Sequence, residues 1–87
     1  MATFVMELYL SRHAACEPDA TVRRVTVAAD ELTASGIEVR YLRSIFIPAD
    51  ETCLILVESK SEADVTLAAR RAGIDPARIA VARAEDG

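Results

Sequence analysis

The sequence predicts an α+β fold, with a four-stranded antiparallel sheet and two helices on one face of that sheet. Two observations carry this prediction. Segments with alternating apolar residues, typical of strands, and segments with apolar residues at steps of three and four, typical of helices, follow one another in the order β-α-β-β-α-β. The two central strands are joined by only four residues, which makes them an antiparallel hairpin. The chain of 87 residues is expected to form one domain, residues 1–87.

The first strand and the first helix are expected in the N-terminal half of the chain. Residues 2–10 alternate, so that apolar side chains cover one face of a strand. The helix is expected within residues 17–36, because Pro18 suits a first helical turn and Gly36 is typical of a helix end. Its apolar stripe consists of Val22, Val25, Ala29 and Leu32.

The second half of the chain supplies the hairpin, the second helix and the last strand. Strands are expected at residues 37–47 and 52–59, with a turn at 48–51 between them. Ser61 begins the second helix as a capping residue and Gly73 ends it. The last strand covers residues 78–84. Because connections are short and crossovers right-handed, these elements favour a ferredoxin-like fold.

The composition excludes several classes of function. The formal net charge is −4 and the basic residues are scattered, which disfavours a nucleic-acid surface. The arginine pairs 23–24 and 70–71 are interpreted as solvated helix surface. No stretch approaches the roughly 20 apolar residues that cross a bilayer. There is no glycine-rich phosphate loop, and two cysteines do not make a disulfide framework. We therefore expect a cytoplasmic protein with reduced thiols.

The sheet face turned away from the helices is the candidate functional surface. If residues 48–51 form the hairpin loop, this free face carries Val5, Glu7, Tyr9, Tyr41, Arg43, Ile45, Leu54, Leu56 and Glu58. An exposed face this apolar is expected to be buried against another molecule. A second copy of the chain related by a two-fold axis would bury it, so we predict a homodimer through this face. Its polar members form a candidate ligand-binding island: Glu7, Tyr9, Tyr41, Arg43 and Glu58. Glu7 is expected to pair with Arg40 or Arg43.

Three stretches resemble a known family. "FVMELYL", "VRYLRSIFIPADETCLILVES" and "AARRAGIDPARI" are similar to a bacterial family of small ferredoxin-like proteins of unknown function, which includes a nickel-binding dimeric branch. The similarity runs over nearly the whole chain. It implies a dimer and a divalent transition metal, with nickel first. No ligand set is transferred, because none of these motifs is a metal-ligand signature.

The residues themselves offer one candidate metal site. His13, the single histidine, and Cys16 are three positions apart just after the first strand, so with Glu7 they form a candidate ligand set. Imidazole with carboxylate suits nickel, zinc or copper. The alternative is a solvated loop histidine and a cysteine packed near a helix start. Cys53 is interpreted as a small core residue.

Two functions follow, and whether the chain is an enzyme stays open. The first is a homodimeric binding protein for nickel or another divalent transition metal. The alternative is a cofactor-independent enzyme of the dimeric α+β-barrel type, acting on a small hydrophobic or aromatic molecule, with Glu7 or Tyr9 in proton transfer. A closed cavity lined by Glu7, Tyr9 and Phe46 would favour the enzyme. A purely structural or partner-binding module, with every polar group of the island paired, is a third possibility.

Overall fold

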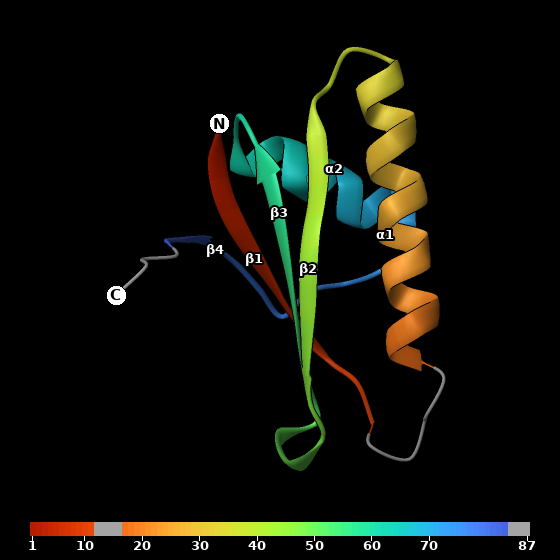
Figure 1. Ribbon diagram of the computed structural model, residues 1–87, viewed down its shortest axis with the longest axis vertical. Coiled ribbons are helices and arrows are strands. Elements are labelled where there is room, and N and C mark those ends of the chain that lie inside the picture. Colours follow the sequence, from red (N-terminus) through yellow and green to blue (C-terminus); the bar gives the residue numbers. More distant parts are fainter. Residues whose placement is uncertain (12–16, 84–87) are drawn as a thin grey trace.

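The computed structural model describes residues 1–11 and 17–83, which form the predicted α+β arrangement (Figure 1). The order β-α-β-β-α-β is confirmed, with a single 3₁₀ turn added inside the hairpin. In chain order the elements are β1 (Ala2–Tyr9), α1 (Glu17–Ala34), β2 (Val39–Ile47), η1 (Pro48–Asp50), β3 (Thr52–Ser59), α2 (Glu62–Ala72) and β4 (Arg78–Ala82). No helix within the described residues is long and apolar enough to span a bilayer.

The four strands form one antiparallel sheet in the order β2-β3-β1-β4. Each helix connects two strands that are not neighbours in the sheet, as in a ferredoxin-like fold. Both helices lie on the same side of the sheet, with α1 beside β2 and α2 behind the central strands (Figure 1). The opposite side is the free face of the sheet.

The core lies between the helices and the inner face of the sheet. The predicted inner residues of β1, Phe4, Met6 and Leu8, are all buried, and Met6 is completely so. Alternation places every second residue of a strand on this side, so β3 contributes its matching set. The central buried side chains also include Val25, Leu32, Cys53, Ile55, Val57 and Val65. The predicted stripe of α1 therefore faces the core, although Val22 at its start is only half-buried.

The ends of α2 follow from their residue types. The Ser61 hydroxyl accepts a hydrogen bond of 3.2 Å from the Asp64 N–H, which satisfies one of the free donors of the first turn. Gly73 ends the helix with φ +72°, and its N–H donates to the carbonyl groups of Ala69 and Arg70. A left-handed conformation at this position favours glycine because a Cβ would be strained. Both predicted boundaries are confirmed.

The hairpin register is the predicted one only near the turn. Ile47 lies opposite Thr52, Ile45 opposite Leu54 and Arg43 opposite Leu56, as expected. The pairing then shifts between Tyr41 and Arg43, so that Tyr41 lies opposite Val57 and Arg40 opposite Glu58. Leu42 is thus the extra residue of a β-bulge, and every side chain beyond it changes face.

The predicted place of Tyr41 on the free face is therefore wrong. Tyr41 packs against the core on the helix side, together with buried Val39. Without the bulge, Arg40 would point into the core and Val39 would face water. Burying an unpaired guanidinium costs far more free energy than the local irregularity of a bulge, which explains the observed register.

Candidate functional site on the free face

The free face of the sheet carries Glu7, Tyr9, Arg43 and Glu58 of the predicted island, but not Tyr41. Residues directly opposite each other on neighbouring strands share a face. Glu7 is opposite Leu54, Val5 is opposite Leu56, and Leu54 is in turn opposite Ile45. The face comprises Thr3, Val5, Glu7 and Tyr9 of β1; Arg40, Arg43, Ile45 and Ile47 of β2; Thr52, Leu54, Leu56 and Glu58 of β3; and Arg78, Ala80 and Ala82 of β4.

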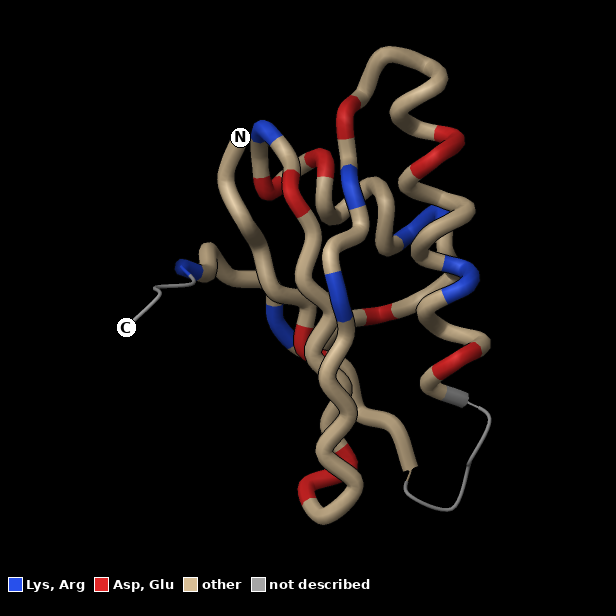
Figure 2. Tube along the Cα trace, viewed as in Figure 1, with Lys and Arg blue, Asp and Glu red and all other residues tan. Residues whose placement is uncertain are grey.

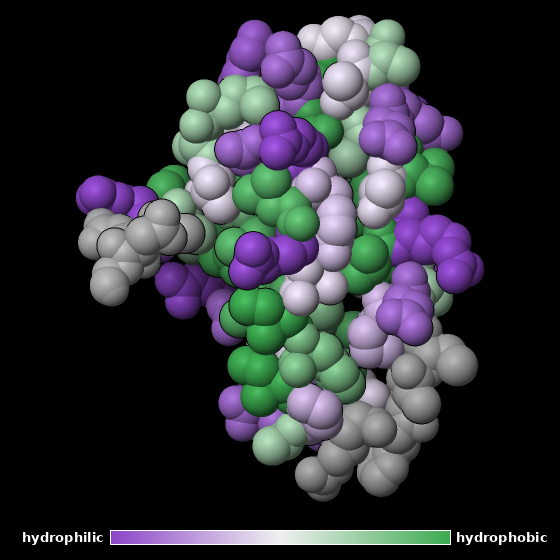
Figure 3. All heavy atoms as spheres, viewed as in Figure 1, coloured by the Kyte–Doolittle hydropathy of each residue, from purple (hydrophilic) through white to green (hydrophobic). Residues whose placement is uncertain are grey.

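An apolar cluster occupies the part of this face where β1, β3 and β2 adjoin. It consists of Val5, Ile45, Ile47, Leu54 and Leu56, and none of the five belongs to the buried core. Ile45 is 45% exposed and Ile47 is 36% exposed. Figure 3 shows hydrophobic surface along the β2–β3 hairpin, interrupted by hydrophilic side chains. Large apolar side chains gathered on one exposed face are typical of an interaction surface.

The carboxylate of Glu7 has a different partner from the one predicted. Its Oε2 lies 4.0 Å from Nη1 of Arg78, and no ion pair joins it to Arg40 or Arg43 among the described residues. Strand order explains this correction. β4 is the direct neighbour of β1 and places Arg78 opposite Glu7, whereas β2 lies two strands away, roughly 10 Å across the sheet.

Glu58 forms the second ion pair of the polar island. Its Oε1 lies 3.7 Å from Nη1 of Arg40, the residue that the bulge turns onto the free face. The Arg40 and Arg78 side chains are about 70% exposed, at 72% and 70%. Pairs this open to water contribute only about 0–1 kcal/mol to stability, so either carboxylate can exchange its partner at low cost.

Tyr9 stands at the end of β1 and is 71% exposed. Beside it lies a small open hollow of about 120 Å³, lined by Glu7, Leu8, Tyr9, Thr52 and Ala77. The Ala77 N–H donates to the Glu7 carbonyl at 2.8 Å and holds the loop before β4 against this end of the strand. Phe46 is on the other face of the sheet and does not line the hollow, so the three residues expected around a closed cavity do not come together.

Tyr41 lies apart from the rest of the predicted island. Its hydroxyl donates to Oγ of Ser44 at 3.3 Å. Its ring lines a groove of about 370 Å³ between α1 and β2, with Asp30, Thr33 and Glu38 among the other lining residues. The sequence pattern gave no signal for this groove, because it depends on the bulge at Leu42.

The predicted metal ligands are described only in part. Glu7 is on the free face, and its side chain is 40% exposed. His13 and Cys16 lie outside the described residues. Within residues 1–11 and 17–83 there is no group of three or more His, Cys, Asp and Glu side chains that could hold a metal ion. Glu7 and its described neighbours in one copy therefore form no such group.

Cys53 is a core residue, as predicted. Its side chain is completely buried on the inner face of β3, and this burial raises the pKa of the thiol above its ordinary value. A nucleophilic cysteine needs the opposite shift and an adjacent base. The position and protonation state of Cys53 fit packing and do not fit covalent catalysis.

Comparison with known proteins supports the fold and goes no further. No protein-family model matches the chain, and no curated protein matches it. Among solved structures, the chain is similar to the crystal structure of SCO4226 from Streptomyces coelicolor A3(2), with a TM-score of 0.70 and 21% sequence identity. The similarity covers 98% of this chain and 100% of that one. At this identity the likeness concerns the arrangement of strands and helices alone.

Proposed function

We propose that the protein is a homodimeric binding protein that assembles through the free face of its sheet. The observation that carries the proposal is the apolar cluster of Val5, Ile45, Ile47, Leu54 and Leu56, which no element of the described chain covers. A second copy related by a two-fold axis would place the same cluster against it. A stable dimer buries on the order of 800 Å² per partner, an area that a four-stranded sheet face can supply.

The charges on this face favour self-association over binding to a partner whose surface is strongly acidic or strongly basic. Glu7 with Arg78 and Glu58 with Arg40 are local pairs of opposite sign, so the face brings nearly balanced charge to an interface. Arg43 projects beside the cluster and is exposed. Charged groups at the edge of an interface set register more than affinity, and the apolar centre provides most of the binding energy.

The ligand that we propose for this dimer is a divalent transition metal, with nickel first. The resemblance of the sequence to a family with a nickel-binding dimeric branch supports it. Glu7 is half-exposed on the free face, and in a dimer each copy would contribute one such carboxylate. The described residues of one copy do not suffice, so the site would also need His13, Cys16 or the second copy. Carboxylate and imidazole are ligands that nickel accepts.

A binding protein agrees better with the geometry than the enzyme alternative does. Proton transfer by Glu7 or Tyr9 on a hydrophobic molecule calls for an enclosed pocket, and the hollow beside these residues is open and only about 120 Å³. The free thiol of Cys53 in the core fits a reducing compartment, and we propose a cytoplasmic location for the dimer.

Native mass spectrometry before and after addition of nickel tests both parts of the proposal. The parent chain is expected to be a dimer that gains metal, and Glu7→Gln is expected to stay dimeric and to lose it. Asp75→Asn, an exposed carboxylate in the loop after α2, is the control for the change of charge. A monomer at micromolar concentration would refute the assembly. A dimer that gains no nickel, zinc or copper would refute the metal and leave the assembly standing.

A further inference from the structure

The two helices form an exposed groove between them that carries three arginines. Its volume is about 290 Å³, and Arg23 and Arg24 of α1 and Arg71 of α2 line it. Figure 2 shows basic residues on the neighbouring helices α1 and α2. We name this feature the arginine groove. The sequence pattern indicates solvated helix surface for the arginine pairs 23–24 and 70–71. In the structure, members of both pairs line one groove.

The charge of the arginine groove is opposite to that of the chain. The whole sequence has 14 acidic and ten basic residues, yet three of those ten basic residues line this one groove. The single acidic residue among the lining residues is Glu31. The groove therefore has a net positive charge on a molecule whose formal net charge is −4. Such a local reversal of sign favours an anion over other ligands.

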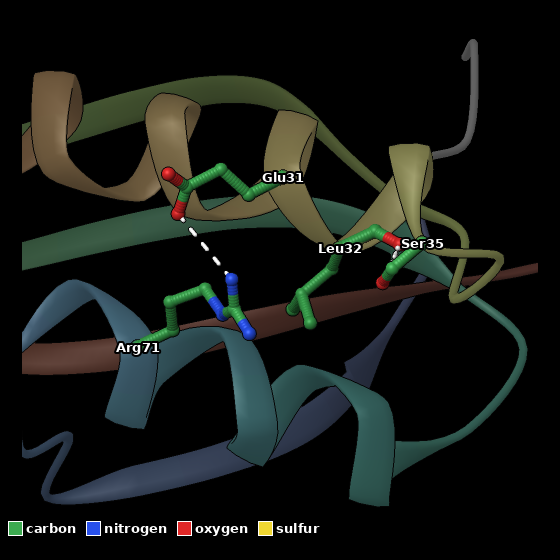
Figure 4. Close-up of polar contacts among 4 residues, drawn as sticks. All are labelled: Glu31, Leu32, Ser35 and Arg71. Atoms are coloured by element: carbon green, nitrogen blue, oxygen red, sulfur yellow. Dashed lines mark hydrogen bonds and ion pairs between the residues drawn. The ribbon is translucent and has the colours of Figure 1, made fainter.

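The existing partners of the three guanidinium groups are weak. Nη1 of Arg71 lies 3.5 Å from Oε1 of Glu31, across the groove (Figure 4). Both side chains are about half exposed, and a pair this open to water is worth little. Arg24 donates a long hydrogen bond of 3.5 Å to the Thr21 hydroxyl. Arg23 takes part in none of the ion pairs of the described chain. All three are available to a stronger acceptor.

Apart from the three arginines and Glu31, the lining of the groove is apolar. Val27 is 51% exposed, and Ala28 and Ala72 lie beside it in the lining. The volume is close to the lower end of the range of small-molecule sites, about 300–1,000 Å³. A guanidinium group matches the paired oxygens of a carboxylate or a phosphate ester. We propose that the arginine groove binds a small organic anion, with its charged group at the arginines and its apolar part on Val27.

This site is independent of the proposed dimer. The arginine groove belongs to the helix layer, and the free face is the opposite side of the sheet (Figure 1). A dimer closed through the free face would leave one open groove on each copy. A chain that binds no metal, or that stays monomeric, would therefore still bind an anion at the groove, and loss of anion binding would leave the proposed dimer unaffected.

Titration of the full chain with phenyl phosphate, followed by ¹H–¹⁵N correlation spectra, tests the proposal. Saturable shifts are expected at the amides around Val27, Glu31 and Ala72. 3-Phenylpropionate carries a carboxylate in place of the phosphate and shows which anion the groove prefers. Inorganic phosphate lacks the phenyl ring, so its weaker binding measures the contribution of the apolar contact with Val27. Phenethylamine carries a positive charge and is expected not to bind. Arg71→Gln is expected to weaken binding about tenfold, since it removes a charged hydrogen-bond donor.

Two further variants make the test specific. Arg70→Gln removes the same charge from the same helical turn but does not line the groove, and it is expected to change the affinity less than about twofold. Glu31→Gln releases Arg71 and removes the competing carboxylate, so it is expected to tighten binding a few-fold. Equal losses in Arg70→Gln and Arg71→Gln, shifts spread over all arginines, or no saturable binding of any of the anions would overturn the proposal.

Discussion

Ser59 is an isolated polar side chain in an apolar environment. It is completely buried at the end of β3, and its Oγ has no hydrogen-bond partner among the described residues. A buried hydroxyl without a partner carries a desolvation cost of about 1–3 kcal/mol. Ser59→Ala removes the hydroxyl and keeps the shape. It is expected to raise the free energy of unfolding by about 1 kcal/mol in urea denaturation. Ser44→Ala, which removes the acceptor of the Tyr41 hydroxyl, is the control and is expected to lower it slightly.

The buried thiol of Cys53 predicts a loss of stability at alkaline pH. Burial raises its pKa in the folded chain above the ordinary value of 9.0. The folded state therefore keeps the proton to higher pH than the unfolded state does. The contribution of this group is fully present below about pH 9 and is lost as the pH rises through the folded pKa.

Urea denaturation of the parent and of Cys53→Ala, in reducing buffer, measures this effect. The parent is expected to be the more stable at about pH 8, because the variant leaves a small cavity, and the difference is expected to shrink towards about pH 10.5. All other residues are common to both chains, so their contributions cancel in the difference between the two stabilities. A difference that is constant with pH would show that Cys53 keeps an ordinary pKa in the folded protein.

At the scale of an element, α2 depends on the cap at Ser61. The Ser61 hydroxyl accepts a hydrogen bond from the Asp64 N–H. The negative charges of Glu62 and Asp64 in the first turn interact favourably with the positive end of the helix dipole. Ser61→Ala is expected to lower the free energy of unfolding by about 1 kcal/mol, whereas Ser61→Asp, which preserves the acceptor, is expected to change it little. Thermal and urea unfolding measure both. Equal losses in the two variants would show that the side chain acts through packing.

The elements also show what the sequence pattern can and cannot predict. The caps and the strand ends near the turn follow from local chemistry, and β3 has the predicted bounds, residues 52–59. The bulge at Leu42 is not visible in the pattern, because alternation alone permits both registers. It follows from the cost of turning Arg40 into the core, which requires pairing the strands in three dimensions. The Glu7–Arg78 pair could have been predicted from the strand order of a ferredoxin-like sheet, which places the first and last strands side by side.

The candidate site was predictable to a similar degree. The apolar cluster on the free face follows from alternation, because Ile45, Leu54 and Leu56 lie within the correctly predicted part of the hairpin. The arginine groove does not, because the packing of one helix against another is invisible in the periodicity of either. Arg23 and Arg71 belong to exposed positions of their own helices, and only the packing of α1 beside α2 gives them a common surface.

For the whole molecule, the test is whether the free face or the helix layer controls assembly. Ile45 on β2 is 45% exposed and Leu67 on α2 is 39% exposed, so the two form a matched pair on opposite layers. Lysine at either position stays in water in a single copy and costs little folding free energy. In a dimer closed through the free face, Ile45→Lys would bury one unpaired charge from each copy in the interface, and burying such a charge costs several kcal/mol.

Sedimentation equilibrium of Ile45→Lys and Leu67→Lys measures this difference. Ile45→Lys is expected to weaken the dimer at least about a hundredfold, because the buried lysines have no partner in the interface. Leu67→Lys is expected to dimerise like the parent. The opposite result, with loss of the dimer only in Leu67→Lys, would mean that the helix layer is the interface. The arginine groove would then adjoin that contact, and anion binding would have to compete with assembly.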